Sequence, residues 1–220
     1  MSNYRIKIQY DGSRYRGWQR QQGEKNTIQG RIEQVLSKQM EFPVTIDGAG
    51  RTDAGVHAKE QVANFRLNTE KTTQQLQDVL NEYLPEDIRI LKVEEAGERF
   101  HSRLNATGKV YEYCLCKKGG FDVFGRKYMW QMDKELDVVR MRQAVEKLVG
   151  EHDFKGFCTK ASRKKSTVRN LYDITITEDE NRIYLTFYGS GFLYNMVRIL
   201  TGTLVEIGTV SYTHLRAHET

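Results

Sequence analysis

The stretch LYDITITEDENRIYLTFYG at residues 171–189 constrains the fold more than any other part of the chain. Two runs in which apolar and polar residues alternate flank the polar run from Glu178 to Asn181. A period of two is typical of a β-strand, because successive side chains of a strand point to opposite faces. The stretch therefore predicts an antiparallel hairpin whose turn is formed by Glu178 to Asn181.

Strand and helix patterns alternate along the rest of the chain, and they do so twice. In the first half, apolar residues recur at helical spacing from Ile28 to Leu36, directly after Thr27, which we interpret as an N-cap. A second helical pattern ends at Pro85, because proline cannot continue a helix. Strands are expected in the segments 4–10, 44–46, 63–67 and 90–96.

The second half repeats the pattern of the first, although not its letters. KVYEYCLCKKG at 109–119 predicts a strand and a glycine-containing loop, and a helical face follows between Leu136 and Val149. From Phe192 a long apolar helix is expected, with a single charge at Arg198. We therefore predict an α+β protein of two similar halves with mostly antiparallel sheets, divided into domains 1–103 and 104–210.

Composition excludes several classes of protein. No apolar run approaches the roughly 18 residues of a membrane span, and MSNYRIKIQY enters a strand pattern at once, where a signal peptide would need an apolar segment. We therefore expect a cytoplasmic protein without a membrane partner. Cys114, Cys116 and Cys158 lack C-x-x-C spacing, so that neither a disulfide framework nor a zinc site with His152 is indicated, and no metal is expected.

The formal net charge of +5 is modest, but the basic residues are clustered. One cluster contains Arg14, Arg16 and Arg20, and the other extends from Lys160 to Arg169 and contains Lys164 and Lys165. Such clusters are typical of a polyanion-binding surface, although solvated loops would have the same composition. Tyr15 and Trp18 lie within the first cluster, where exposed aromatic rings would favour stacking on RNA bases.

The stretch GAGRTDAGVHA at 48–58 places one carboxylate, Asp53, among glycines. Gly50 and Gly55 have P-loop spacing, but Val56 and His57 stand where a P-loop continues with Lys and Ser or Thr. A dinucleotide fingerprint would need glycine in place of Asp53, so no nucleotide cofactor is expected. Two interpretations remain: a tight turn in which Asp53 caps its own backbone, or a loop that presents Asp53 to a ligand.

Several motifs occur together in this chain and in one order. They are YDGSRYRGWQRQ at 10–21, GRTDAGVHA at 50–58, RFHSR at 99–103, KVYEY at 109–113 and GFLYNMVR at 191–198. In these motifs the chain resembles the TruA family of tRNA pseudouridine synthases. The resemblance implies the pseudouridine synthase fold with a cleft between the halves, and isomerisation of uridine to pseudouridine at positions 38–40 of the tRNA anticodon stem-loop. The reaction is redox-neutral and implies no cofactor.

The resemblance also implies roles for individual residues. Asp53 is the catalytic carboxylate, which acts on the sugar as a nucleophile or as a base. Arg51 binds a phosphate beside the flipped nucleotide, and Gly50 and Gly55 permit backbone conformations and a close approach that a side chain would block. Tyr111 stacks on the target base. Arg198, as a charge on an apolar helix face, is expected to pair with Asp53. The expected RNA-binding residues are Arg14, Arg16, Arg20, Arg103, Lys164 and Lys165.

Alternatives to these roles exist for each residue by itself. Tyr111 could be a half-buried strand aromatic, Arg198 could pair structurally, and His57 is interpreted as structural. An RNA-binding module without catalysis, or a glycoside hydrolase that uses Asp53, would share parts of the pattern, although a hydrolase would need a second carboxylate.

The resemblance further implies a homodimer that embraces one tRNA. The family continues beyond the last apolar helix through another helix and a strand. We therefore expect a truncated second domain and a non-native tail at 211–220, where SYTHLRAHET shows no clear period. Ser102 stands where alanine is usual in the family's motif, and we expect this substitution to be harmless.

Overall fold

The computed structural model describes residues 1–24, 26–159 and 166–209 of the chain. The chain divides into unit 1, Met1–Ala106, and unit 2, Thr107–Thr220, and each is described by itself. The expected tail at 211–220 lies outside the described residues. Among the described residues, no helix is both long and apolar enough to cross a membrane.

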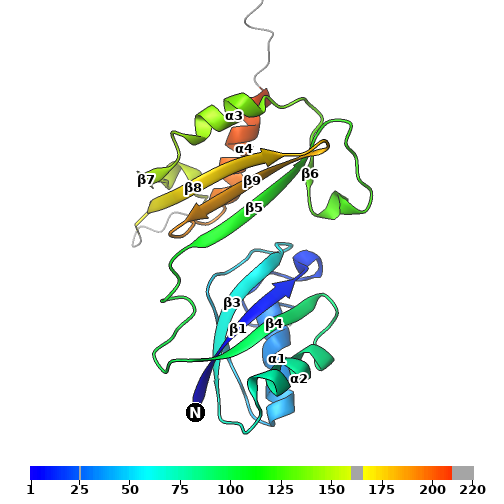
Figure 1. The fold of residues 1–220 in the computed structure, drawn as a ribbon, viewed down its shortest axis with the longest axis vertical. Helices are drawn as coiled ribbons and strands as arrows, with labels where there is room; N and C mark the ends of the chain where they lie inside the picture. Colours follow the sequence, from blue (N-terminus) through cyan, green and yellow to red (C-terminus); the bar gives the residue numbers. More distant parts are fainter. Residues whose placement is uncertain (25, 160–165, 210–220) are drawn as a thin grey trace, which may run out of the picture. The chain divides into compact units, whose positions relative to one another are not determined.

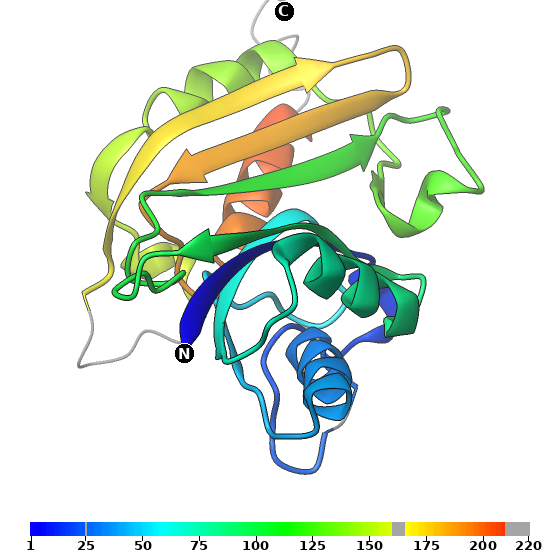
Figure 2. The ribbon, with the colours of Figure 1, turned by 60° about the horizontal axis from the view of Figure 1, so that its bottom comes forward.

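Unit 1 is a four-stranded antiparallel sheet with two helices on one face (Figures 1 and 2). The strands are ordered β2-β3-β1-β4, so the first strand of the chain lies inside the sheet and pairs with both β3 and β4. The elements are β1 (Ser2–Tyr10), the short 3-10 helix η1 (Gly12–Arg14), α1 (Ile28–Met40), β2 (Ile46–Gly48), β3 (Ala58–Leu67), α2 (Thr73–Tyr83) and β4 (Ile88–Ala96).

Local hydrogen bonds determine where the helices of unit 1 begin. The Thr27 hydroxyl accepts from the Gly30 amide at 3.2 Å, which confirms Thr27 as the N-cap of α1. At the start of α2, Thr72 and Gln75 form a reciprocal capping box. Alternate residues of β1, including Ile6 and Ile8, are fully buried in the core that these helices cover.

Unit 2 is a five-stranded sheet of order β6-β5-β9-β8-β7, in which only the short β5–β6 pair is parallel among the described strands. Its main helix, α4, packs its apolar residues into the same core as the sheet, and α3 contacts α4 (Figure 1). The elements are β5 (Lys109–Cys116), η2 (Gly125–Lys127), β6 (Trp130–Gln131), α3 (Val138–Val145), β7 (Gly150–Asp153), η3 (Lys155–Phe157), β8 (Val168–Glu178), β9 (Arg182–Gly189) and α4 (Met196–Thr209).

The hairpin predicted at residues 171–189 is confirmed, as β8 and β9 pair antiparallel on either side of residues 179–181. The Asp179 carboxylate accepts from the amides of Asn181 at 2.9 Å and Arg182 at 2.7 Å. These bonds stabilise the charged form of the carboxylate and lower the pKa of Asp179. Because the Asp179 side chain accepts hydrogen bonds from the backbone of its own turn, the chain reverses at this polar run and the two strands end on either side of it.

Two helix predictions were too long. The helical face expected to reach Val149 ends at Val145, because Leu148 and Val149 form a turn whose amides donate to the Val145 carbonyl. The last helix begins at Met196 and not at Phe192, because Asn195 has a φ of 60°, outside the helical range. The predicted class is nevertheless confirmed, since both units combine helices with mostly antiparallel sheets.

Candidate active site

Asp53 lies in the loop that joins β2 to β3, as the strand patterns on either side predicted. The Asp53 carbonyl accepts from the Val56 amide at 3.2 Å and closes a tight turn. Gly55, inside this turn, has a φ of 77°, a left-handed conformation that favours glycine. The Asp53 side chain is exposed and accepts no hydrogen bond from the described residues of unit 1. The alternative in which this carboxylate caps its own turn is therefore wrong.

The end of β1 and the segment that follows it form hydrogen bonds with the Asp53 loop. The Trp18 amide donates to the Thr52 carbonyl at 3.0 Å, and the Gly55 amide donates to the Tyr15 carbonyl at 3.3 Å. The hydroxyl groups of Tyr10 and Thr52 lie 2.9 Å apart and share a hydrogen bond. Because these bonds lie on both sides of Asp53, the loop backbone is fixed while the carboxylate remains at the surface.

Two glycines of YDGSRYRGWQRQ make room for this loop. A Cβ at Gly12 would lie 2.0 Å from the Val56 carbonyl oxygen, and one at Gly17 would lie 2.5 Å from the Thr52 carbonyl oxygen. A Cβ at Gly55, in contrast, would meet nothing within 4 Å. Gly12 and Gly17 therefore allow the first motif to pack closely against the Asp53 loop, while Gly55 supplies the backbone conformation that we expected of it.

His57 joins the same two segments, in agreement with the structural role that we expected for it. Its Nδ1 atom lies 3.1 Å from the Gly12 amide nitrogen and 2.9 Å from an Asp11 carboxylate oxygen. A neutral ring accepts the Gly12 hydrogen bond, whereas a protonated ring pairs with Asp11. In both states His57 links the Asp53 loop to the residues that follow β1.

The prediction that Tyr15 and Trp18 stack on RNA bases is wrong, because both side chains belong to the core of unit 1. Their exposed fractions are 4% and 2%. The Tyr15 hydroxyl donates to Asp87 at 2.5 Å, and burial together with this bond raises the pKa of Tyr15 to about 12. The Trp18 indole packs against Gly48 so closely that a Cβ added at Gly48 would lie 2.5 Å from the nearest indole atoms.

Each arginine of the first basic cluster has an acidic partner. Arg14 pairs with Asp87 at 3.1 Å, and Arg16 lies 3.9 Å from Glu24. The side chains of Arg14 and Arg16 are 77% and 73% exposed, so these pairs contribute only about 0–1 kcal/mol each and leave the guanidinium groups accessible to another anion. The Arg20 side chain is also exposed, at 58%, but it differs from both because its partner Glu33 is buried.

The RFHSR segment is anchored to the sheet of unit 1 by polar side chains whose anchoring role the sequence patterns did not predict. The buried Ser102 donates through its hydroxyl to the Asp47 carbonyl at 2.6 Å, and its amide donates to Asn64 at 2.8 Å. Asn3 donates to the carbonyls of Gly97 and Phe100. The sequence signal of this anchor is a pair of asparagines inside buried strands, Asn3 in β1 and Asn64 in β3. Arg103 follows Ser102 and is exposed.

In unit 2 the motifs KVYEY and GFLYNMVR lie side by side. Tyr111, on β5, is half-buried, and its ring packs edge-on against Phe192 with 5.0 Å between the ring centroids. Arg198 is exposed, so that its expected place on the apolar face of a helix is wrong. The buried stripe of α4 instead contains Met196, Leu200 and Leu204, at intervals of four residues that leave Arg198 to one side.

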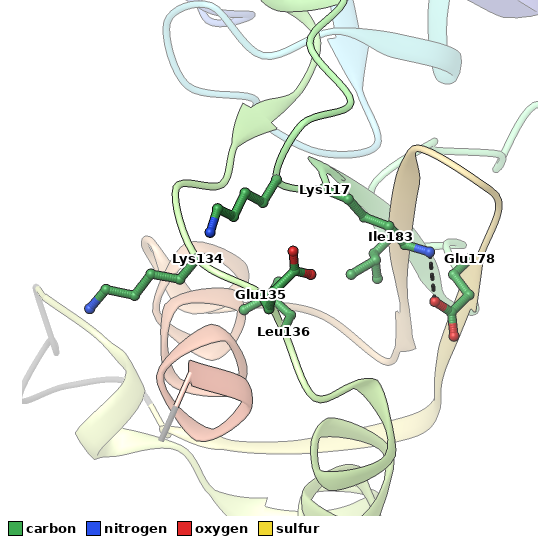
Figure 3. A pocket seen from close by; sticks show the side chains of 7 residues that line it. Lys117, Lys134, Glu135, Leu136, Glu178 and Ile183 are labelled. Atoms are coloured by element: carbon green, nitrogen blue, oxygen red, sulfur yellow. Dashed lines mark ion pairs between the residues drawn. The ribbon is translucent and has the colours of Figure 1, made fainter. Parts of the chain in front are cut away.

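A polar hollow of about 220 Å³ lies beyond the opposite end of β5 from Tyr111 (Figure 3). It contains the ion pair between Lys117 and Glu178, at 2.8 Å, and no residue that the sequence predicted for the site. Lys164 and Lys165 lie outside the described residues. In the part of the chain that the structure describes, no group of three or more His, Cys, Asp or Glu side chains could hold a metal ion.

Comparison with known proteins agrees with the motifs. The family model described as tRNA pseudouridine synthase matches residues 6–105 and 144–217. tRNA pseudouridine synthase A of Bacillus sp. (strain KSM-64) is 46% identical over 208 residues, which are 94% of this chain and 85% of the relative. tRNA pseudouridine synthase A 2 of Bacillus anthracis is 44% identical over the same shares of both chains. tRNA pseudouridine synthase A of Clostridium botulinum (strain Alaska E43 / Type E3) is 41% identical over 95% of this chain and 85% of its own. The chain therefore belongs to the TruA family of tRNA pseudouridine synthases, isomerases that act on uridine in tRNA.

Proposed function

We propose that this enzyme forms pseudouridine at positions 38–40 of the tRNA anticodon stem-loop, with Asp53 as its catalytic carboxylate. The observation that supports the assignment of Asp53 most directly is its setting. Backbone bonds hold Thr52 and Gly55 on either side, while the carboxylate itself is exposed and has no partner among the described residues of unit 1. A carboxylate that is free to meet a ligand on a fixed loop suits a reacting group.

The chemistry requires a carboxylate and no redox partner. The bond between uracil N1 and ribose C1′ breaks, the uracil turns while it stays bound, and C5 forms the new bond to C1′. The proton that leaves C5 is balanced by the proton that N1 gains, so substrate and product are isomers. Positive charge develops at the sugar when the base departs, and Asp53 either forms a covalent bond to the sugar or acts as a base on it.

Other residues are assigned by the family resemblance. Arg51, exposed two positions before Asp53, is proposed to bind a phosphate of the flipped nucleotide. Tyr111 is proposed to stack on the target base, and Arg198 to pair with Asp53, for which its exposed guanidinium is available. We propose that further phosphates contact the basic side chains of Arg14, Arg16, Arg103, Lys164 and Lys165.

The position of the modification is tested by sequencing the product. Unmodified tRNA with uridine at positions 38, 39 or 40 is incubated with the enzyme and mapped for pseudouridine by chemical labelling. We expect product only at these positions, and none in transcripts that carry cytidine there. Modification elsewhere in the tRNA would contradict the site assignment, tRNA binding without product would indicate an RNA-binding module, and release of free uracil would indicate a hydrolase.

We propose further that the enzyme works as a homodimer in the cytoplasm, where its tRNA substrate is found. In the expected arrangement one protomer holds the tRNA body while its partner receives the target uridine. Sedimentation velocity at the concentrations of the activity assay should therefore give the mass of two chains. A single-chain mass in samples that modify tRNA at the full rate would contradict the dimer.

A further inference from the structure

We propose that Arg20 is a positioning residue for the Asp53 loop and does not bind a tRNA phosphate. Its guanidinium neutralises the buried carboxylate of Glu33, and this pair secures the segment on which the Asp53 loop rests. The proposal rests on the catalytic role of Asp53 proposed above. It revises the role that the sequence suggested for Arg20, whose neighbours Arg14 and Arg16 remain candidates for phosphate binding.

Glu33 requires a cation for physical reasons. It lies in α1, and its side chain is only 3% exposed. One carboxylate oxygen accepts from Gln29 at 2.9 Å and from the Ile46 amide at 3.0 Å. The other is buried and accepts no aligned hydrogen bond from the described residues, but it lies 3.0 Å from the Arg20 guanidinium. A buried carboxylate without a compensating charge is strongly unfavourable, so Arg20 has a fixed task inside unit 1.

Gln29 connects this ion pair to the backbone on both sides. Its side-chain oxygen accepts from the Arg20 amide at 2.9 Å and from Gln19 at 2.7 Å. Its side-chain nitrogen donates to Glu33 and to the Ile46 carbonyl at 3.0 Å. All of the hydrogen-bonding capacity of the amide is therefore used, and its orientation is determined. Networks that are satisfied in this way are rigid, because any rotation would leave buried polar atoms unpaired.

The network continues to the residue before Asp53. The first amides of α1, from Ile28 and Gln29, donate to the carbonyls of Gly17 and Trp18 at 3.1 Å and 3.0 Å. The Trp18 amide in turn donates to the Thr52 carbonyl at 3.0 Å. A loss of the charge pair at Arg20 would loosen residues 17–20, and two of these, Gly17 and Trp18, pack against the Asp53 loop.

Arg16 provides a matched control four residues earlier in the same segment. Its partner Glu24 lies 3.9 Å away, and neither side chain is buried, so Arg16 has no comparable task in the core. If Arg16 binds a phosphate, its loss should make the dependence of log Kd on log salt shallower by roughly 0.7–0.9, the change that one phosphate contact produces. Loss of Arg20 should leave this slope unchanged.

The experiment compares Arg20→Met, Arg20→Lys, Glu33→Gln, the double variant Arg20→Met/Glu33→Gln and Arg16→Met. We expect Arg20→Met to lower kcat on tRNA about 10- to 100-fold, as for other displaced catalytic groups, and to change Kd by less than about threefold. Arg20→Lys keeps the charge and should recover most of kcat. Because Arg20 acts through Glu33, the factors by which the two substitutions lower kcat should not multiply in the double variant. The double variant also contains no unpaired buried charge and so remains folded.

Backbone exchange separates this proposal from the role of Asp53. The Trp18 amide should exchange with deuterium faster in Arg20→Met than in Arg16→Met, whether or not Asp53 is catalytic. An unchanged Trp18 exchange rate, a salt slope that falls in Arg20→Met as it does in Arg16→Met, or multiplying effects in the double variant would overturn the proposal. An active Asp53→Asn variant with the expected exchange behaviour would instead refute only the assignment of Asp53.

Discussion

Asp53→Asn is expected to form pseudouridine at less than about 1% of the wild-type rate, because loss of a nucleophile or base commonly costs orders of magnitude. The substitution keeps the size of the side chain and removes its charge and nucleophilicity. Since the Asp53 side chain is exposed and forms no hydrogen bond with the described residues of unit 1, its loss should leave the thermal transition unchanged. The rate is measured in single turnover by mass spectrometry of labelled product.

The matched control for this variant is Asp47→Asn. Asp47 lies in β2, the strand that leads into the Asp53 loop, and its side chain is 65% exposed. Its substitution therefore tests the loss of a neighbouring surface charge without loss of the reacting group. We expect Asp47→Asn to retain the wild-type rate within a few-fold, and both variants to bind tRNA within a few-fold of the wild-type Kd. Residual activity above about 1% in purified Asp53→Asn would remove Asp53 from the mechanism.

Gly12→Ala is expected to lower kcat about 100-fold or more and to destabilise unit 1, although Gly12 does not lie in the Asp53 loop. The added Cβ would lie 2.0 Å from the Val56 carbonyl oxygen. Both are close to the backbone, so the clash can be relieved only if the backbone of one segment moves. Overpacking of this kind costs about 1–3 kcal/mol of stability, and displacement of a catalytic group by about 1 Å can cost roughly 100-fold in rate. The change is measured by thermal melting together with single-turnover kinetics.

Gly97→Ala is the control for the added methyl group. It lies in the same unit, and a Cβ there would meet no atom within 4 Å, so we expect wild-type stability and rate. A Gly12→Ala enzyme that works within a few-fold of the wild-type rate would show that the packing between the two segments does not position Asp53. A loss of activity in Gly97→Ala of the same size would show that the assay reports on folding alone.

Sequence patterns predicted those features of the fold that depend on neighbouring residues. The turn of the β8–β9 hairpin is closed by Asp179 on amides two and three residues away, and Thr27 caps α1 by a bond to Gly30. The alternation that predicted β1 reports directly on which side chains are buried. Each of these signals lies within one turn or strand, where short-range geometry leaves few conformations.

The sequence by itself determined the family, through its motifs, and the α+β class and the loop that carries Asp53, through the periodicity of its strands and helices, because both kinds of signal consist of neighbouring residues. Only the tertiary structure decided which residues of the first motif face inward. Tyr15 bonds to Asp87, 72 positions away, and Arg20 neutralises Glu33 on α1, so aromatic and basic residues that suggest an RNA surface belong partly to the core. The physical reason is that burial and charge pairing depend on which distant segments meet, and a local pattern contains no information about such contacts.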